Sequence, residues 1–421
     1  MGDILFLAHR IPYPPDRGDK IRAFHLLRHL SRAHRVHLVA FADDPADLDG
    51  KEGLAPYTET REIFWRKAPT AWTGLRAVLQ RRPVSLVAFA DPAVRRTVDA
   101  LLDAHPIDTI FLYSSQMAQY LPAAPTQRVI MDFVDMDSAK FAAYAGNARG
   151  PMAWIHRREA ALLLRHEQRV ARDADASLFV SGAEAALFRT RAGASRIHAI
   201  ENGIDTTFYD PARRFEPVPG AGPLLVFTGQ MDYRPNIAAV RWFADRVFPR
   251  IHETHPDARF AIVGRAPTPA VQALAERPGV CVIGAVPDVR NWLAAATLVV
   301  APLQLARGIQ NKVLEGMAMA RPVVASPAAA EGIDHAGTLR VAEGPEAFGD
   351  AVLGLLAEPA IAAALGSAAR ARVIARYGWD ARLEPLDALL QAPAVPRHRR
   401  GGVGCDRLVP GRYDADHERR S

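Results

Sequence analysis

A glycine, a lysine and a glutamate recur at helical spacing in LQLARGIQNKVLEGMAMARPVVAS, residues 303–326. At about 100° per residue, Gly308, Lys312 and Glu315 share one flank of a helix that begins near Ile309. A helix amino terminus approached through a glycine favours a diphosphate, and a nearby lysine neutralises phosphate charge. A carboxylate two turns into the helix can accept both hydroxyls of a ribose. The pattern predicts a nucleoside diphosphate site; the alternative is a solvated Lys312–Glu315 pair without a ligand.

Polar groups also follow strand-like segments in the first half of the chain. His9 ends the first segment and is either a general base or an ordinary loop histidine. Asp135, Asp137 and Lys140 end a later one and either line a substrate site or cap the next helix. No cluster of His, Cys, Asp and Glu has metal-ligand spacing, so we expect no metal.

Buried-strand patterns alternate with amphipathic helices twice along the chain, as in βαβ units. Strands are expected at 4–8, 36–41, 108–114, 128–135 and 176–181, and again at 224–229, 258–264, 280–284, 298–302 and 322–326. A proline-rich segment, 210–223, separates the two series. The sequence thus predicts an α/β protein with two Rossmann-like, doubly wound domains facing a central cleft. We place them at 1–205 and 206–375, followed by a helix, 376–391, that crosses back to the first domain, and a disordered basic tail, 392–421.

Composition limits the function classes. With 421 residues, 49% hydrophobic and 23% charged, the chain suits two globular domains. The net charge of +6 is not gathered in one stripe, so no nucleic-acid partner is expected. Two cysteines suit a reducing compartment, and neither a signal peptide nor a run of about 20 apolar residues is evident. We expect a cytoplasmic protein, with residues 71–89 forming either an interfacial helix on anionic lipid at the inner face of the plasma membrane or a packed helix.

Several segments resemble the GT4 family of GT-B glycosyltransferases: GIQNKVLEGMAMARPVVAS with EGI, IENGID, VFTGQMDYRPN and GAVPDVRNWLAAATLVVAPL. The resemblance covers roughly residues 3–390. MDFVDMDSAKF and PYPPDRGDKIR are similar to the exopolysaccharide sugar transferases associated with the PEP-CTERM/exosortase system. The resemblance implies retaining transfer from a nucleoside diphosphate sugar to a saccharide or lipid-linked saccharide acceptor in exopolysaccharide or cell-surface glycan synthesis. It implies no cofactor beyond this sugar donor.

The resemblance also assigns donor-site roles. The second glutamate of the family's E-x7-E motif, the ribose ligand, falls at Glu315, whereas the first falls at Arg307, a departure that leaves donor-sugar recognition open. The base-binding segment falls at Val286 and Pro287. The family's diphosphate-binding cations usually follow the first strand of the second domain, where Arg234 is the one basic residue, so Arg265, Arg307 and Lys312 are substitutes. We expect donor contacts from Gly308 and Ile309 and catalysis by Arg307, Lys312 and Asp135.

In the first domain, residues 14–22 resemble the family's glycine-bearing loop that faces the donor phosphates and the acceptor. Gly18 permits close approach, and Arg17, Lys20 and Arg22 supply charge. The alternative is an ordinary basic surface loop.

Three other functions are alternatives to this one. A UDP-sugar 2-epimerase would need acidic and histidine groups converging on the sugar. A nicotinamide-dependent oxidoreductase is disfavoured because no G-x-G-x-x-G follows either opening strand. A non-catalytic sugar-nucleotide-binding protein is suggested by Arg307 in place of a glutamate.

Overall fold

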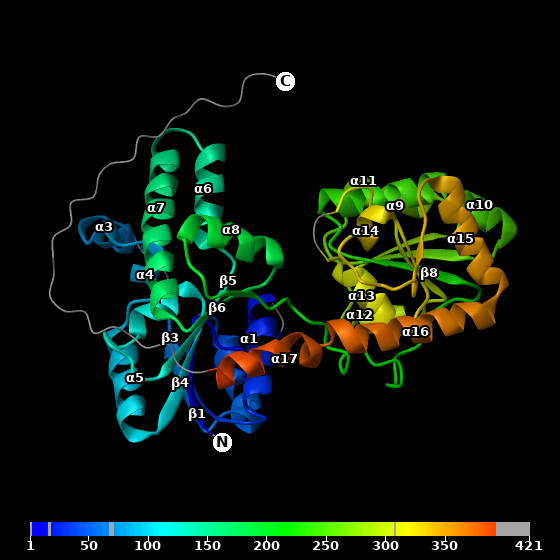
Figure 1. Cartoon of the computed structure of the whole chain (residues 1–421). Helices are drawn as coiled ribbons and strands as arrows, with labels where there is room; N and C mark the ends of the chain where they lie inside the picture. Colours follow the sequence, from blue (N-terminus) through cyan, green and yellow to red (C-terminus); the bar gives the residue numbers. More distant parts are fainter. Residues whose placement is uncertain (1, 16–17, 67–70, 307–308, 393–421) are drawn as a thin grey trace.

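The computed structural model describes residues 2–15, 18–66, 71–306 and 309–392. Figure 1 shows two lobes, each built around a sheet with helices against it, linked by the chain near residue 205 and by the last two helices. Within the described residues every strand pairing in both sheets is parallel. The predicted fold, two Rossmann-like α/β domains, is confirmed.

The first domain contains a seven-stranded sheet of order β3-β2-β1-β4-β5-β6-β7. Its strands are β1 (Asp3–Ala8), β2 (Arg35–Ala42), β3 (Thr60–Trp65), β4 (Ile107–Tyr113), β5 (Arg128–Val134), β6 (Ala176–Phe179) and β7 (Ile197–Ala199). Its helical segments are α1 (Gly18–Leu30), α2 (Pro45–Asp49), η1 (Lys51–Tyr57), α3 (Ala71–Leu79), α4 (Val84–Ala88), α5 (Pro92–Ala104), η2 (Ser115–Tyr120), α6 (Asp137–Asn147), α7 (Gly150–Asp173) and α8 (Gly182–Ala192). Strand order reverses between β1 and β4, where ligands of such sheets usually bind.

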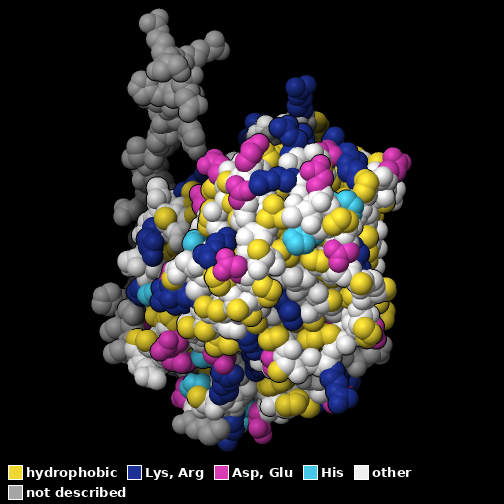
Figure 2. All heavy atoms as spheres, turned by 90° about the vertical axis from the view of Figure 1, so that its right-hand side faces the viewer, with side chains coloured by type: hydrophobic (Ala, Val, Ile, Leu, Met, Phe, Trp, Pro, Cys, Tyr) yellow, Lys and Arg dark blue, Asp and Glu magenta, His cyan; other side chains and the backbone are white. Residues whose placement is uncertain are grey.

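The second domain contains a six-stranded sheet of order β10-β9-β8-β11-β12-β13. Its strands are β8 (Leu224–Thr228), β9 (Arg259–Val263), β10 (Val280–Gly284), β11 (Leu298–Ala301), β12 (Val323–Ala325) and β13 (Arg340–Val341). Its helical segments are α9 (Arg234–Arg246), α10 (Phe248–Thr254), α11 (Pro269–Gln272), η3 (Ala273–Glu276), α12 (Val289–Ala295), α13 (Asn311–Ala318), α14 (Pro327–Ala330), α15 (Pro345–Ala357) and α16 (Pro359–Tyr377). The strand order reverses between β8 and β11. Figure 2 shows cationic and anionic side chains interspersed over the outer face of this domain.

The chain crosses between the domains at two adjacent points. The Ile204 amide donates to the Tyr377 carbonyl at 2.7 Å, and Ile204 bridges to Gly378. The last helix, α17 (Trp379–Gln391), then packs its apolar face into the first domain's core beside α1. There the Trp379 ring stacks on the buried His25 ring with centroids 4.5 Å apart.

The structure differs from the sequence expectation in the segment 71–89. The prediction of one continuous helix is wrong: α3 ends at Leu79 and α4 begins at Val84. Arg81 has a left-handed φ of 51°, and Pro83 precedes α4, so the helix cannot continue through this stretch. No single helix in the described chain is long and apolar enough to cross a bilayer; the pair α15 and α16, bent by 105°, meets that test only when the two are joined.

Candidate functional site

Two glycines shape the carboxyl ends of β8 and β9. A Cβ atom on Gly264 would lie 1.6 Å from the Gly229 carbonyl oxygen, and one on Gly229 would lie 2.8 Å from Asn236 Nδ2. Neither position has room for a side chain. The two strand ends therefore lie against each other, and the first turn of α9 approaches the end of β8.

Lys312 and Asn236 meet at this edge of the sheet. Lys312 Nζ, on the first turn of α13, donates to Asn236 Oδ1 at 3.0 Å and lies 5.2 Å from the centre of the Phe227 ring. Asn236 is buried, and its Nδ2 donates to the Gln230 carbonyl at 2.9 Å. Burial lowers the pKa of Lys312, and Glu315 opposes that effect. A cation is thus held at the carboxyl end of β8.

Glu315 lies one turn further along α13. Burial raises the pKa of its carboxyl group, whereas a hydrogen bond from the Tyr209 hydroxyl and the charge of Lys312 lower it. Tyr209 belongs to the segment between the domains, and its backbone carbonyl accepts a hydrogen bond from Arg370 at 2.7 Å. Two neighbours therefore stabilise the ionised form of the Glu315 carboxyl group: the Tyr209 hydroxyl by a hydrogen bond and Lys312 by its positive charge. Tyr209 was missed by the sequence analysis, because its position in a connecting segment gives no signal of this contact.

The other residues expected to bind the sugar donor differ in their exposure and in their contacts. Ile309 and Val286 are half-buried against the domain core, and Pro287 is exposed beyond β10. Arg265 is exposed and donates to Gln230 Oε1 at 3.1 Å, while Arg234 is exposed at the start of α9. Arg307 and Gly308 lie outside the described residues. The structure thus brings together Lys312, Glu315 and the Gln230–Arg265 contact.

Lys20 and Arg22 occupy an environment other than the expected phosphate-facing loop. Both are almost wholly buried. Lys20 Nζ lies 2.5 Å from an Asp47 oxygen, and Arg22 Nε donates to Asp132 Oδ2 at 2.9 Å. Arg22 Nη1 also donates to the Ile200 carbonyl at 2.8 Å. Because α1 turns both side chains toward the domain interior, their charges are neutralised there. We therefore give them structural roles; Gly18 opens α1 with space around it, and Arg17 lies outside the described residues.

The carboxyl edge of the first sheet carries a second polar cluster. His9, after β1, stacks on Tyr113 of β4 with ring centres 5.6 Å apart. Gln116 Nε2 donates to Asp137 at 3.4 Å; burial raises the pKa of Asp137, and the Lys140 and His9 charges lower it. Asp135, an expected catalytic residue, lies 2.7 Å from Lys140 Nζ. The cluster offers hydrogen-bonding groups suited to a hydroxylated ligand, and Gln116 is a member that the sequence did not reveal.

Asp3, His37 and His105 form the closest group of potential metal ligands in the described chain, with ligand atoms within 4.8 Å of one another. These three residues are so far apart in the sequence that their spacing does not indicate a common site. Asp3 Oδ1 accepts a hydrogen bond from Arg35 Nε at 2.8 Å, and His37 Nδ1 lies 3.0 Å from the Thr60 hydroxyl oxygen. Since an arginine already neutralises the carboxylate, the group fits an internal ion-pair network better than a cation site.

Comparison with known proteins agrees with this architecture. Residues 18–208 match the family described as Glycosyltransferase Family 4, and residues 222–358 match Glycosyl transferases group 1. Anabaena Alr3699/HepE in complex with UDP has a similar fold, with a TM-score of 0.56 and 17% identity over 93% of this chain and 99% of that one. Sucrose-phosphate synthase from Thermosynechococcus elongatus gives 0.57 and 19% identity over 92% and 98%.

A curated relative is alpha-maltose-1-phosphate synthase of Mycolicibacterium smegmatis, 31% identical over 219 residues, 44% of this chain. The match spans about half of that relative's length, 54%. Fold and matches together define a glycosyltransferase of the GT-B class. The first domain carries the match to Glycosyltransferase Family 4, and the second domain carries the match to Glycosyl transferases group 1.

Proposed function

We propose that this protein transfers a sugar from a nucleoside diphosphate sugar to a saccharide acceptor with retention of anomeric configuration. The observation that carries the proposal is the arrangement on α13, where Lys312 is held by Asn236 and Glu315 follows one turn later. An ammonium group and a carboxylate at this spacing match the diphosphate and the ribose of one ligand.

The donor is expected to lie across the carboxyl edge of the second sheet. Its diphosphate would contact Lys312 and the amino terminus of α13, where helix polarity favours negative charge. Its ribose hydroxyls would bond to Glu315, and its base would lie near Val286 and Pro287. Because HepE is described in complex with UDP, a uridine nucleotide is the first donor to test.

In the proposed transfer, the bond between the anomeric carbon and the diphosphate oxygen breaks while the acceptor oxygen bonds the same carbon from the same face. The leaving phosphate oxygen takes the acceptor proton, so charges and atoms balance without a separate base. Lys312 stabilises the leaving diphosphate, and Arg307 is expected to assist. No cofactor or metal enters this scheme.

The acceptor is expected at the carboxyl edge of the first sheet. His9, Gln116 and Asp137 present donors and acceptors there, and Asp135 with Lys140 borders them. Hydroxyl groups of a saccharide suit such a mixed cluster. An acceptor of exopolysaccharide or cell-surface glycan synthesis fits this chemistry.

We also propose that the first domain rests on the cytoplasmic face of a membrane. Trp72 and Leu79 of α3 are 77% and 76% exposed, and Trp154 near the start of α7 is 57% exposed. Arg76 is exposed on α3. Large apolar groups with an intervening cation are typical of a peripheral contact with anionic lipid.

The test is turnover of UDP-, GDP- and dTDP-sugars by the full chain with a membrane-lipid extract as acceptor. Release of the free nucleoside diphosphate only when acceptor is present supports the transferase. Interconversion of UDP-sugars without acceptor would identify an epimerase instead. Binding of sugar nucleotides without any turnover, with every donor and extract tried, would identify a non-catalytic binding protein.

A further inference from the structure

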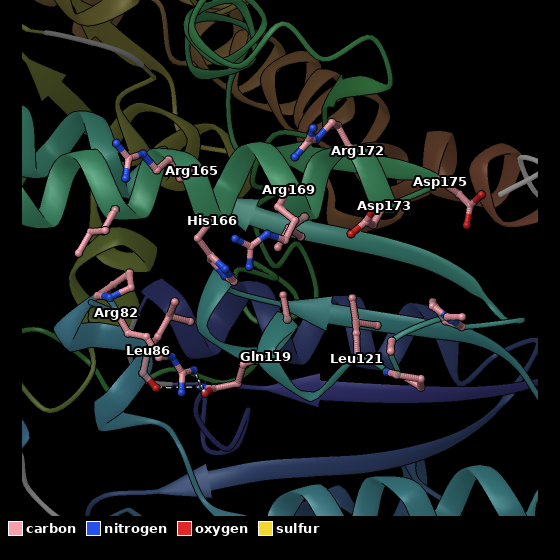
Figure 3. A pocket seen from close by; sticks show the side chains of 18 of the residues that line it. Arg82, Leu86, Gln119, Leu121, Arg165, His166, Arg169, Arg172, Asp173 and Asp175 are labelled. Atoms are coloured by element: carbon pink, nitrogen blue, oxygen red, sulfur yellow. Dashed lines mark hydrogen bonds between the residues drawn. The ribbon is translucent and has the colours of Figure 1, made fainter. Parts of the chain in front are cut away.

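A long groove runs along the first domain, on the sheet face covered by α5 and α7. The connection from β4 to β5 contains only the six-residue η2 and a proline-rich stretch, residues 121–125. Parallel strands are usually joined by a full helix, which would fill the space between neighbouring helices. Here that space remains open as a cavity of about 1430 Å³ (Figure 3).

One wall of the groove is a row of arginines on α7. Arg165, Arg169 and Arg172 recur at intervals of four and three residues, so they share one helix face. All three are exposed, and none has an acidic partner within ion-pair distance among the residues that the structure describes. Like charges at this spacing destabilise a helix. A row of uncompensated arginines in a concave site therefore indicates an anionic ligand.

The opposite wall adds positive charge. Arg82 Nη2 donates to Gln119 Oε1 at 3.0 Å, which fixes its guanidinium at the mouth of the groove (Figure 3). Between the walls, His166 Nε2 lies 2.9 Å from the Ser115 carbonyl oxygen. Asp173 and Asp175 lie toward the other end, so the cationic part of the groove is the end near Arg82 and Arg165.

The floor of the groove is apolar. It is formed by apolar side chains of the helical segments and of the proline-rich stretch, some buried and some half-buried: Leu86, Ala118, Leu121, Pro122, Leu162 and Val170. A free phosphate or a nucleotide would leave this floor exposed to water. A ligand that combines negative charge with a hydrocarbon chain covers both parts.

We propose that this groove binds a lipid phosphate, with its phosphate or diphosphate group among Arg82, Arg165 and Arg169 and its hydrocarbon chain along the apolar floor. Gln119, on the wall of the groove, donates to the Gln116 carbonyl at 2.9 Å, and Gln116 contacts Asp137. The headgroup would thus be near the candidate acceptor cluster. The idea that this lipid carries the acceptor saccharide rests on the proposed function; binding of the lipid phosphate does not.

The test measures binding of farnesyl diphosphate, inorganic pyrophosphate and farnesol to the full chain by calorimetry. We expect farnesyl diphosphate to bind at least tenfold more tightly than either of the other two. The double variant Arg165→Ala/Arg169→Ala should weaken it by tenfold or more. Leu162→Gln should weaken farnesyl diphosphate but not pyrophosphate. Arg157→Ala, an exposed arginine of α7 outside the groove, is the matched control and should bind as the parent protein does.

Equal binding of pyrophosphate and farnesyl diphosphate would overturn the proposal in favour of a simple anion site. Absence of farnesyl diphosphate binding, or unchanged binding by the double arginine variant, would also overturn it. Melting temperature and UDP binding of every variant are measured in parallel, because the groove variants should keep both. If the parent protein does not bind UDP, that result counts against the proposed donor site and leaves the test of the groove unaffected.

Discussion

Lys312 and Asn236 join two helices of the second domain, since the lysine ammonium group on α13 donates to the asparagine oxygen on α9 at 3.0 Å. Asn236 is itself fixed by its bond to the Gln230 carbonyl. The cation is therefore positioned before any ligand arrives. Such preorganisation reduces the entropy lost when a diphosphate binds.

Replacing Lys312 with alanine should weaken UDP binding by tenfold or more, because the charge opposite the diphosphate is removed. Asn236→Ala should have a smaller effect, since the lysine remains but is no longer held. Calorimetry with UDP measures both. Arg241→Ala, at an exposed site on α9, is the control and should match the parent protein. Parent-like affinity in Lys312→Ala would contradict the placement of the diphosphate.

UDP binding should also depend on pH through Glu315. Burial raises the pKa of this carboxyl group. As pH falls through that raised value, the group gains a proton and can no longer accept two hydroxyls, so UDP affinity should fall. Glu315→Gln should bind UDP weakly and lose this pH dependence. The pH dependence should be smaller for the parent protein with 2′-deoxy-UDP, which offers one hydroxyl fewer. An unaltered pH profile in both cases would argue against a ribose contact.

Arg22 should prove structural. Its partner Asp132 is completely buried, so Arg22→Ala leaves a carboxylate without its cation in the protein interior. We expect a loss of about 3–5 kcal/mol in the free energy of unfolding, measured by urea denaturation. Arg22→Lys should retain part of that stability. A stable Arg22→Ala protein that fails to bind UDP would instead restore the phosphate role inferred from the sequence.

Glu167 should make the stability of the first domain depend on pH. The side chain accepts bonds from the Ser138 amide at the start of α6, and burial raises its pKa to about 7. Between roughly pH 4.5 and 7, the Glu167 carboxyl group therefore keeps its proton in the folded state but releases it in the unfolded chain. Stability from this group should fall as pH rises through that range, by about 3 kcal/mol at most.

The test for Glu167 compares the parent protein with Glu167→Gln, which keeps the hydrogen-bonding shape and removes the titration. Unfolding free energies of the two are measured between pH 5 and 8. The parent should lose stability relative to the variant as pH increases. A constant difference across this range would mean that Glu167 does not titrate there.

The sequence predicted what depends on local pattern. Buried runs such as VHLVAF and LLVFT identified the central strands, because strands covered on both faces are continuously apolar. The edge strand β3, TREIFW, was missed since its polar, half-exposed residues lack that pattern. The flank shared by Lys312 and Glu315 followed from helical geometry alone. Contacts between residues distant in sequence could not be predicted in this way. For example, nothing in the sequence near Arg22 indicates that Asp132 neutralises its charge.

Connections proved harder to interpret than elements. The interval between β4 and β5 contains only the six-residue η2, and no sequence pattern indicates the groove that this leaves beside α7. Nothing in the sequence around Arg81 indicates its left-handed conformation, so the pattern over 71–89 predicts one helix. In each case the decisive information is a missing or interrupted helix, which periodicity does not detect.

The two chain crossings at Ile204 and Gly378 make the first domain discontinuous in sequence. Trp379, Leu383 and Leu386 of α17 are buried in its core beside β1, although they follow the second domain along the chain. In topological terms the second domain is an insertion. A fragment ending at residue 205 would leave a stripe of apolar surface on α1 uncovered and prone to aggregate, so the first domain can be isolated only as a permuted chain that retains α17.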